Sequence, residues 1–130
     1  LSPSNQAWRV GVEVPDPARH GSVQRIVRIT DGSIATSGDY RNFLEQDGHR
    51  YSHTVDPRNG HPIAHDTASV SVIHPSAMWA DGYATLLNVL GEAEGLAFAN
   101  THGLAAMFIV RGENGLEERY TPSFESALLD

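Results

Sequence analysis

The sequence contains no cysteine and no lysine, and each absence removes several kinds of protein chemistry. Without cysteine the chain has no disulfide, no thiol nucleophile and no thiolate metal site, and its redox compartment stays open. All nine basic residues are arginine, so the chain also lacks a Schiff-base amine and the lysine of a P-loop.

Positive charge and long apolar runs are also scarce. The formal net charge of −7 leaves no cluster of positive charge for phosphate backbones, so we expect no nucleic-acid partner. The longest apolar run, residues 104–110, is far shorter than the roughly 20 residues that cross a bilayer, so we expect no membrane-spanning segment in this chain. The start, Leu1-Ser2-Pro3, has no methionine and no leader pattern, which indicates a processed chain or part of a longer one.

Most of the remaining pattern predicts strands. With 130 residues, of which 40% are apolar, the chain suits one compact domain. Tight-turn dipeptides at Asp31-Gly32 and Asp47-Gly48 predict two hairpins, 23–36 and 40–55. Residues 56–62 are dense in turn formers and predict a loop, and 124–129 form a short tail. The remaining expected strands are 8–14, 67–73, 104–110 and 116–120, the last two paired as a hairpin.

The period changes to that of a helix after Ser76. An apolar stripe recurs at helical spacing, and Gly91 can end this helix before a second short one at 92–100. The stripe consists of Trp79, Tyr83, Leu86, Leu87 and Leu90. The sequence therefore predicts an α+β fold, a mainly antiparallel sheet with a helical pair packed on one face.

The helix face opposite this stripe carries polar side chains. Asp81 and Thr85 are four residues apart, with Asn88 nearly in line, so the first two can converge on one point. A carboxylate and a hydroxyl are hard oxygen donors that suit Mg²⁺, which takes few protein ligands and completes its shell with water and phosphates. By spacing alone, the wet side of an amphipathic helix explains the same residues.

A histidine and an aspartate mark the segment that follows the second hairpin. His53 can act as a general base because imidazole exchanges protons near neutral pH, and Asp56 can orient it. A strand histidine followed by an Asp-Pro turn is the alternative. Zinc at His53, His61 and His65 is a minority alternative, since Pro62 keeps the last two from sharing a helix face.

Small hydrogen-bonding residues end the strand before that hairpin. Thr36, Ser37, Gly38 and Asp39 form a turn where backbone N–H groups and hydroxyls can approach a phosphate, although an ordinary loop reads the same way. Ser37 also suggests a serine hydrolase, but the G-x-S-x-G pattern is absent and we discount that function.

Taken in order, these segments resemble the ApbE family of FAD:protein FMN transferases. Residues 34–41 read IATSGDYR, residues 51–60 read YSHTVDPRNG, and residues 80–85 read ADGYAT, followed by VLG at 89–91. The resemblance runs from WRVG at 8–11 to FIV at 108–110, nearly the whole chain. It implies that residues 1–130 are a single unit, the C-terminal portion of an ApbE-like flavin transferase whose N-terminal portion is absent.

The resemblance implies a reaction and a role for each candidate residue. FMN would pass from FAD to a threonine hydroxyl of a target protein, with release of AMP and a requirement for Mg²⁺. Asp81 and Thr85 would hold the metal, His53 would be the base, and Asp56 would support it. The nucleotide would lie against the turn of Thr36, Ser37, Gly38 and Asp39.

The resemblance leaves alternative functions open, and the sequence departs from the family pattern in places. FAD pyrophosphatase activity, giving FMN and AMP, and a non-catalytic flavin-binding domain are the alternative functions. Family members usually have a small or aliphatic residue where Gly82 and Tyr83 stand here. The N-terminal portion of the family supplies much of the flavin pocket and a carbonyl ligand for the metal, so this portion alone is expected to be impaired. Many members are lipoproteins on the periplasmic side of the bacterial inner membrane, and the cytoplasm stays an alternative location.

Overall fold

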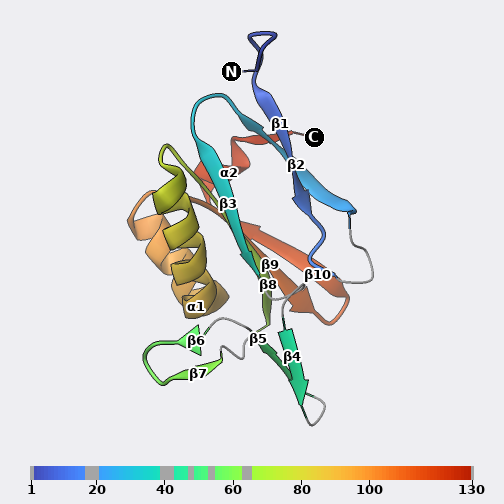
Figure 1. Cartoon of the computed structure of the whole chain (residues 1–130), viewed down its shortest axis with the longest axis vertical. Helices are drawn as coiled ribbons and strands as arrows, with labels where there is room; N and C mark the ends of the chain where they lie inside the picture. The colour runs from blue at the N-terminus through green and yellow to red at the C-terminus, as the bar shows by residue number, and fades with distance from the viewer. Residues whose placement is uncertain are drawn as a thin grey trace.

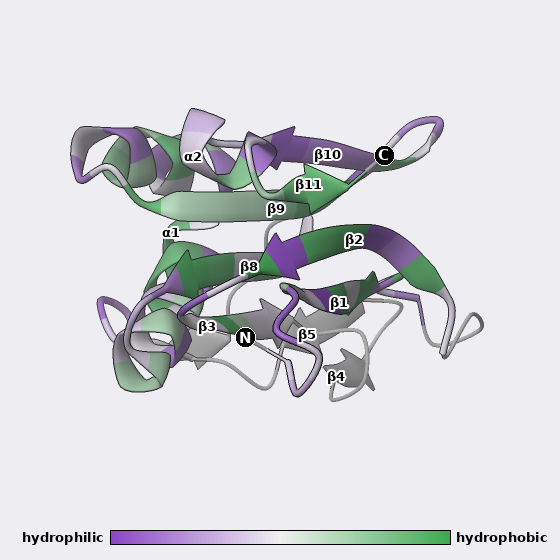
Figure 2. Cartoon of the chain, turned by 90° about the horizontal axis from the view of Figure 1, so that it is seen from above, coloured by the Kyte–Doolittle hydropathy of each residue, from purple (hydrophilic) through white to green (hydrophobic). Residues whose placement is uncertain are grey.

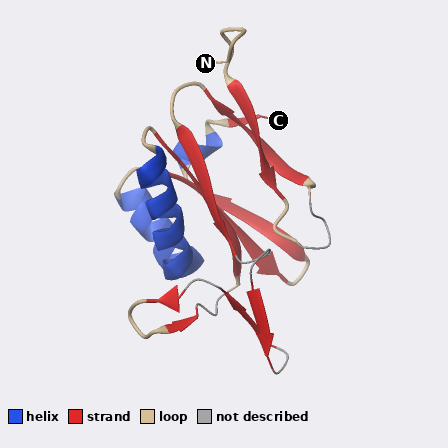
Figure 3. Ribbon diagram, viewed as in Figure 1, coloured by secondary structure: helices blue, strands red, loops and turns tan. Residues whose placement is uncertain are grey.

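The chain folds into three layers, two antiparallel sheets and a long helix (Figures 1 and 3). The computed structural model describes residues 2–16, 21–38, 43–46, 49–52, 55–62 and 66–129. A four-stranded sheet lies in the middle, with a three-stranded sheet on one face and α1 (Ala77–Thr101) on the other. The predicted α+β class, a mainly antiparallel sheet with helix on one face, is confirmed.

The four-stranded sheet has the order β10-β9-β8-β3 and every neighbouring pair is antiparallel. Its inner strands are buried along most of their length because both of their faces are covered, and β9 is also mostly hydrophobic (Figure 2). The predicted strand at 67–73 and the hairpin at 104–120 are confirmed. The strands are β3 (Ser33–Gly38), β8 (Thr67–His74), β9 (Ala105–Gly112) and β10 (Gly115–Tyr120).

The three-stranded sheet contains β1 (Trp8–Glu13), β2 (Val23–Ile29) and β11 (Leu128–Leu129), in the order β1-β2-β11. The last segment is more than the predicted tail, because it forms α2 (Pro122–Glu125) and then pairs with β2. Phe124 explains this outcome, since its fully buried ring anchors α2 between the two sheets. Residues 128–129 thus form an edge strand of the three-stranded sheet.

The hairpin predicted around Asp31-Gly32 is wrong. β2 pairs with β1 and β11, whereas β3 pairs with β8, so the chain leaves one sheet at this turn and enters the other. Gly32 has φ 141°, which suits the abrupt change of direction, and Ser33 Oγ donates to the carbonyl of His74 at 2.8 Å. The turn signal was correct, but a turn does not determine which strands pair.

The second predicted hairpin is confirmed, as β4 (Phe43–Gln46) pairs with β5 (His49–Ser52). The loop predicted at 56–62 is a turn closed by a short antiparallel pair, β6 (Val55–Asp56) with β7 (His61–Pro62). Gly60 has φ 72°, a conformation that most other residues avoid. Both pairs lie at the end of the molecule where β3 ends and β8 begins (Figure 1).

Alternation along β9 separates two hydrophobic cores. Phe108 and Val110 face α1, and Met107 and Ile109 face the three-stranded sheet. The first core also contains Leu87 of the helix, and the second contains Phe124 of α2. The central sheet is therefore held from both sides.

Helix α1 is broken at Gly91, as the sequence predicts. Gly91 has φ 82° and ψ 177°, which only glycine adopts readily, and helical geometry resumes beyond it until Thr101. His102 then caps the end, where its backbone N–H donates to the carbonyl of Phe98 at 3.1 Å. Among the described residues, no helix combines the length and the apolar character needed to span a membrane.

The predicted apolar stripe of α1 is partly wrong. Trp79 and Leu86 are exposed, at 51% and 36%, and the buried side is set by Ala80 and Ala84 together with Leu87. Alanine lets the helix approach the sheet closely, which a large side chain at the same position would prevent. The large side chains therefore turn to the flank, where Trp79 packs on Tyr83 with ring centroids 5.6 Å apart.

One glycine of α1 gives a direct test of this geometry. A Cβ at Gly82 would meet no atom within 4 Å, and its backbone is helical, so Gly82→Ala should stabilise the protein by up to about 1 kcal/mol. Gly103→Ala is the matched control, because that site is equally open but has φ 65° and should be destabilised. Thermal unfolding of both variants measures the difference, and a lower melting temperature for Gly82→Ala would contradict the open site.

Candidate functional site

The candidate metal helix begins at a firmly fixed point. Ser76 caps α1, with its Oγ accepting from the backbone N–H of Trp79 at 3.4 Å. Its own N–H donates to Nδ1 of His74, the last residue of β8, at 3.0 Å. Strand and helix are joined with only Pro75 and Ser76 between them. The first half of α1 is thus anchored to the central sheet.

Asp81 and Thr85 are exposed side chains one helical turn apart on this half of α1. Their neighbours Ala80 and Ala84 are fully buried, so the two oxygen donors lie on a flank of the helix that points away from the core. The two residues are exposed and lie one turn apart, as the sequence predicts, and their convergence on one point stays a prediction. The role of the pair as a metal site stays a prediction too.

Asn88 departs from the prediction that it continues the wet face. Its side chain is 1% exposed, and its Nδ2 donates to Oγ of Ser37 at 3.2 Å. Spacing placed Asn88 on the same side of the helix as Thr85, but at Asn88 this side of the helix is covered by β3. A polar stripe that starts in solvent therefore ends in a buried contact with the strand predicted to hold the nucleotide.

The turn predicted to begin at Thr36 is wrong, because Thr36, Ser37 and Gly38 all belong to β3. Thr36 and Ser37 lie on opposite faces of this strand, as neighbours in a strand must. Thr36 is hydrogen bonded to Ser71 of β8, with 2.8 Å between the two hydroxyl oxygens, whereas Ser37 faces α1. Gly38 ends the strand opposite Ser69, whose Oγ is buried with no hydrogen-bond partner in the described part of the chain. The structure thus brings Ser37, and not Thr36, to the helix that carries Asp81.

The other predicted residues are only partly described. Asp39 and His53, with the minority zinc ligand His65, lie outside the described residues. Asp56 is placed by its backbone in β6, opposite His61 of β7.

The turn that follows Asp56 is tied to the second half of α1. Arg58 of this turn forms an ion pair with Glu94, with 3.4 Å between Nη1 and Oε2. Both side chains are more than half exposed, so this pair adds little to stability.

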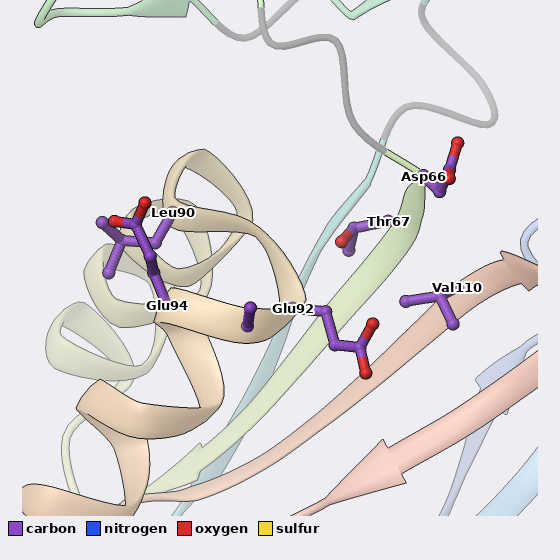
Figure 4. A pocket seen from close by; sticks show the side chains of 7 residues that line it. Asp66, Thr67, Leu90, Glu92, Glu94 and Val110 are labelled. Carbon is purple, nitrogen blue, oxygen red and sulfur yellow. The ribbon is translucent and has the colours of Figure 1, made fainter.

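A cavity in the described part of the chain has the wrong charge for a pyrophosphate. It has a volume of about 280 Å³ and lies beside the break of α1 at the ends of β8 and β9 (Figure 4). Glu92 extends from the helix toward Thr67 and Val110, and Asp66 and Glu94 add further carboxylates. Glu92 also forms an ion pair with Arg119, 3.3 Å from Oε1 to Nε. None of the predicted site residues lines this cavity.

Sequence reasoning missed the contact between Asn88 and Ser37. Helical spacing assigned Asn88 to solvent, because it lies seven residues after Asp81 and three after Thr85. The available signal was the spacing of Ala80, Ala84 and Leu87, which defines a buried face next to Asn88. Small residues carry little weight in a hydrophobic pattern, so the large side chains dominated the prediction.

Comparison with known proteins gives consistent matches. Residues 1–108 match the model of the ApbE family. The FAD:protein FMN transferase of Vibrio cholerae is 46% identical over 121 residues, which cover 93% of this chain and 36% of that protein. The Salmonella typhimurium FAD:protein FMN transferase is 40% identical, with 99% and 37% covered. The apo crystal structure of the flavinyl transferase ApbE of Pseudomonas stutzeri has a TM-score of 0.76 and 44% identity, covering 92% of this chain and 36% of that one.

The fold is an antiparallel α+β unit that is similar in structure to the flavinyl transferase ApbE of Pseudomonas stutzeri. The chain belongs to the ApbE family. It spans a little over a third of the length of the curated relatives named above.

Proposed function

We propose that the protein transfers FMN from FAD to a threonine hydroxyl of an acceptor protein, with release of AMP and a requirement for Mg²⁺. The observation that carries the proposal is the exposed pair of oxygen donors, Asp81 and Thr85, within a chain of the ApbE family. The similar proteins of Vibrio cholerae and Salmonella typhimurium bear the name FAD:protein FMN transferase, which supports the same reaction here.

The donor pair fits Mg²⁺ in its chemistry. A carboxylate and a hydroxyl are hard oxygen ligands, and Mg²⁺ often uses only one or two protein carboxylates besides water and phosphate oxygens. Within the described residues, no three His, Cys, Asp or Glu side chains gather into a cage. Asp81 and Thr85 would therefore form part of the shell, and the substrate's phosphates and further donors would complete it.

The proposed reaction needs a proton acceptor and a held pyrophosphate. Mg²⁺, when bound, would neutralise negative charge on the phosphate oxygens. His53 would accept the proton of the threonine hydroxyl, whose oxygen forms a bond to the flavin-side phosphorus. The bond from that phosphorus to the bridging oxygen breaks, and the oxygen leaves with AMP. Asp56 would orient His53.

The nucleotide would be held at the end of β3. Ser37, Gly38 and Asp39 would bind its phosphates through hydroxyl and backbone N–H groups. Thr36 would support this nucleotide site indirectly, because its hydroxyl is hydrogen bonded to Ser71 on the opposite face of the strand and so fixes β3 to β8.

The decisive experiment incubates the complete protein with FAD, Mg²⁺ and an acceptor protein that carries a target threonine. Mass spectrometry should find the acceptor heavier by one FMN, and chromatography should find an equal amount of AMP. FMN and AMP formed at the same rate without acceptor would identify a pyrophosphatase instead. Tight FAD binding with no AMP under any divalent metal would identify a flavin-binding domain.

A further inference from the structure

A buried polar contact joins the two halves of the candidate site. Asn88 of α1 is 1% exposed and donates through Nδ2 to Oγ of Ser37 at 3.2 Å. Ala84 and Leu87 of the same helix are fully buried, and so is Val70 of β8, the cross-strand neighbour of Ser37. A primary amide in such a place costs free energy unless it is hydrogen bonded, so leucine would be the ordinary residue there.

The contact sits at the end of the line of donors. Asp81, Thr85 and Asn88 are spaced at four and three residues, so their side chains project from nearly the same side of α1. Thr85 lies about 4.5 Å along the helix axis from Asn88, at 1.5 Å per residue. Ser37, in turn, is followed by Gly38, the last residue of β3. This hydrogen bond therefore links the helix of the proposed metal donors to the strand that carries Ser37 and Gly38, two of the proposed phosphate-binding residues.

A hydrogen bond restricts geometry in a way that apolar packing does not. A donor and an acceptor must stay near 3 Å apart and aligned. The bond between Asn88 and Ser37 therefore restrains both the axial position and the rotation of α1 relative to β3, in addition to the packing of the helix on the sheet. These are the two quantities that set where Asp81 and Thr85 point relative to the phosphates of a nucleotide at the end of β3.

We propose that Asn88 is a positioning residue of the flavin-transfer site. Through its bond to Ser37, Asn88 keeps the donors Asp81 and Thr85 correctly placed relative to the phosphate-binding residues at the end of β3. The proposal rests on the proposed function, because it assigns the metal to α1 and the nucleotide to the end of β3. Partners that orient metal ligands indirectly affect metal affinity by about 10- to 100-fold when they are removed.

The test measures metal binding directly, with Mn²⁺ as a paramagnetic probe and FAD present, on the complete protein. Asn88→Leu keeps the number and branching of the side-chain heavy atoms and removes the bond, so the dissociation constant for Mn²⁺ should rise about 10-fold. The melting temperature should change little, because an apolar side chain suits this interface. Asn88→Ser, which replaces the amide with a shorter side chain that carries a hydroxyl, serves if the leucine variant does not fold and should show the same rise.

Two further variants separate positioning from general packing. Leu87→Val removes one methylene from the same interface without touching the bond, and it should lower the melting temperature while leaving Mn²⁺ affinity unchanged. Ser37→Ala should weaken Mn²⁺ binding. Combining it with Asn88→Leu should weaken binding little further, since both substitutions remove the same hydrogen bond between Asn88 and Ser37.

The outcomes distinguish the two proposals. No Mn²⁺ binding by the unaltered protein with FAD would overturn the proposed function and the positioning role together. Normal Mn²⁺ binding by the unaltered protein and equal binding by Asn88→Leu would overturn the positioning role alone. Equal weakening by Leu87→Val and Asn88→Leu would also overturn it, because packing would then explain the effect.

Discussion

Asp81→Asn should lower Mg²⁺-dependent FMN transfer by about 100-fold or more, while the protein keeps its fold. The substitution preserves the shape of the side chain and removes the negative charge that a metal ligand needs. Asp81 is exposed on α1, and no packing depends on its carboxylate in the described structure. The loss should appear as a higher Mg²⁺ concentration for half-maximal rate, measured by AMP release at a fixed FAD concentration.

The control for this variant is Asp31→Asn. Asp31 is an exposed aspartate in the turn between the two sheets, so the same chemical change is made outside α1 at a residue that is not a proposed metal donor. Asp31→Asn should keep its rate and its Mg²⁺ dependence. A normal Mg²⁺ dependence in Asp81→Asn would show that the metal is held elsewhere.

Phe108→Ala should destabilise the protein by about 3–5 kcal/mol, the usual cost of removing a buried phenylalanine ring. Phe108 is fully buried in the core between α1 and the central sheet. Its ring fills the space opposite Gly95, where a Cβ would lie 2.6 Å from Cζ of Phe108 and 3.2 Å from the carbonyl oxygen of Leu87. Urea titration of the free energy of unfolding measures the cost.

The same contact predicts the behaviour of Gly95→Ala. The added methyl group meets a ring that cannot move, so the variant should lose about 1–3 kcal/mol, even though alanine favours a helix. Phe108→Leu should relieve this clash, and Gly95→Ala should then cost less in that background than alone. Strictly additive free energies for the two substitutions would mean that the ring and the glycine are not in contact.

Local signals predicted much of the fold. The strand at 67–73 is a run of β-branched and apolar residues, and the hairpin of β9 and β10 has Glu113-Asn114-Gly115 between two strand patterns. The break at Gly91 follows from glycine alone. Each of these features depends on residues close together in the sequence, which is why pattern and propensity suffice.

Pairing between distant strands could not be predicted in the same way. Asp31-Gly32 specifies a turn, but whether β2 and β3 pair depends on what else competes for their edges. β3 pairs with β8, and β2 pairs with β1 and β11. The partner β11 lies near the other end of the chain, so no local signal at Asp31 reveals it.

The sequence predicted which residue types the candidate site contains, but not which of them are buried or in contact with another element. Asp81 and Thr85 lie one turn apart in any helix, so their exposure on α1 confirms a local prediction. Asn88 could not be placed, because its burial depends on how closely Ala80 and Ala84 let α1 approach the sheet. The resemblance to a family supplied the roles of these residues, which neither spacing nor burial provides.

The break at Gly91 divides α1 into two segments that need not open together. Backbone hydrogen bonds in a helix form a continuous ladder, and local unfolding that starts at one end spreads along it. The conformation of Gly91 interrupts the ladder, so opening that begins near His102 should stop before Leu90. Amide hydrogens of residues 92–100 can then exchange with solvent while those of the donor-bearing first segment stay protected. The chain can thus accept sequence change in the second segment without loosening the part of the helix that the reaction would need.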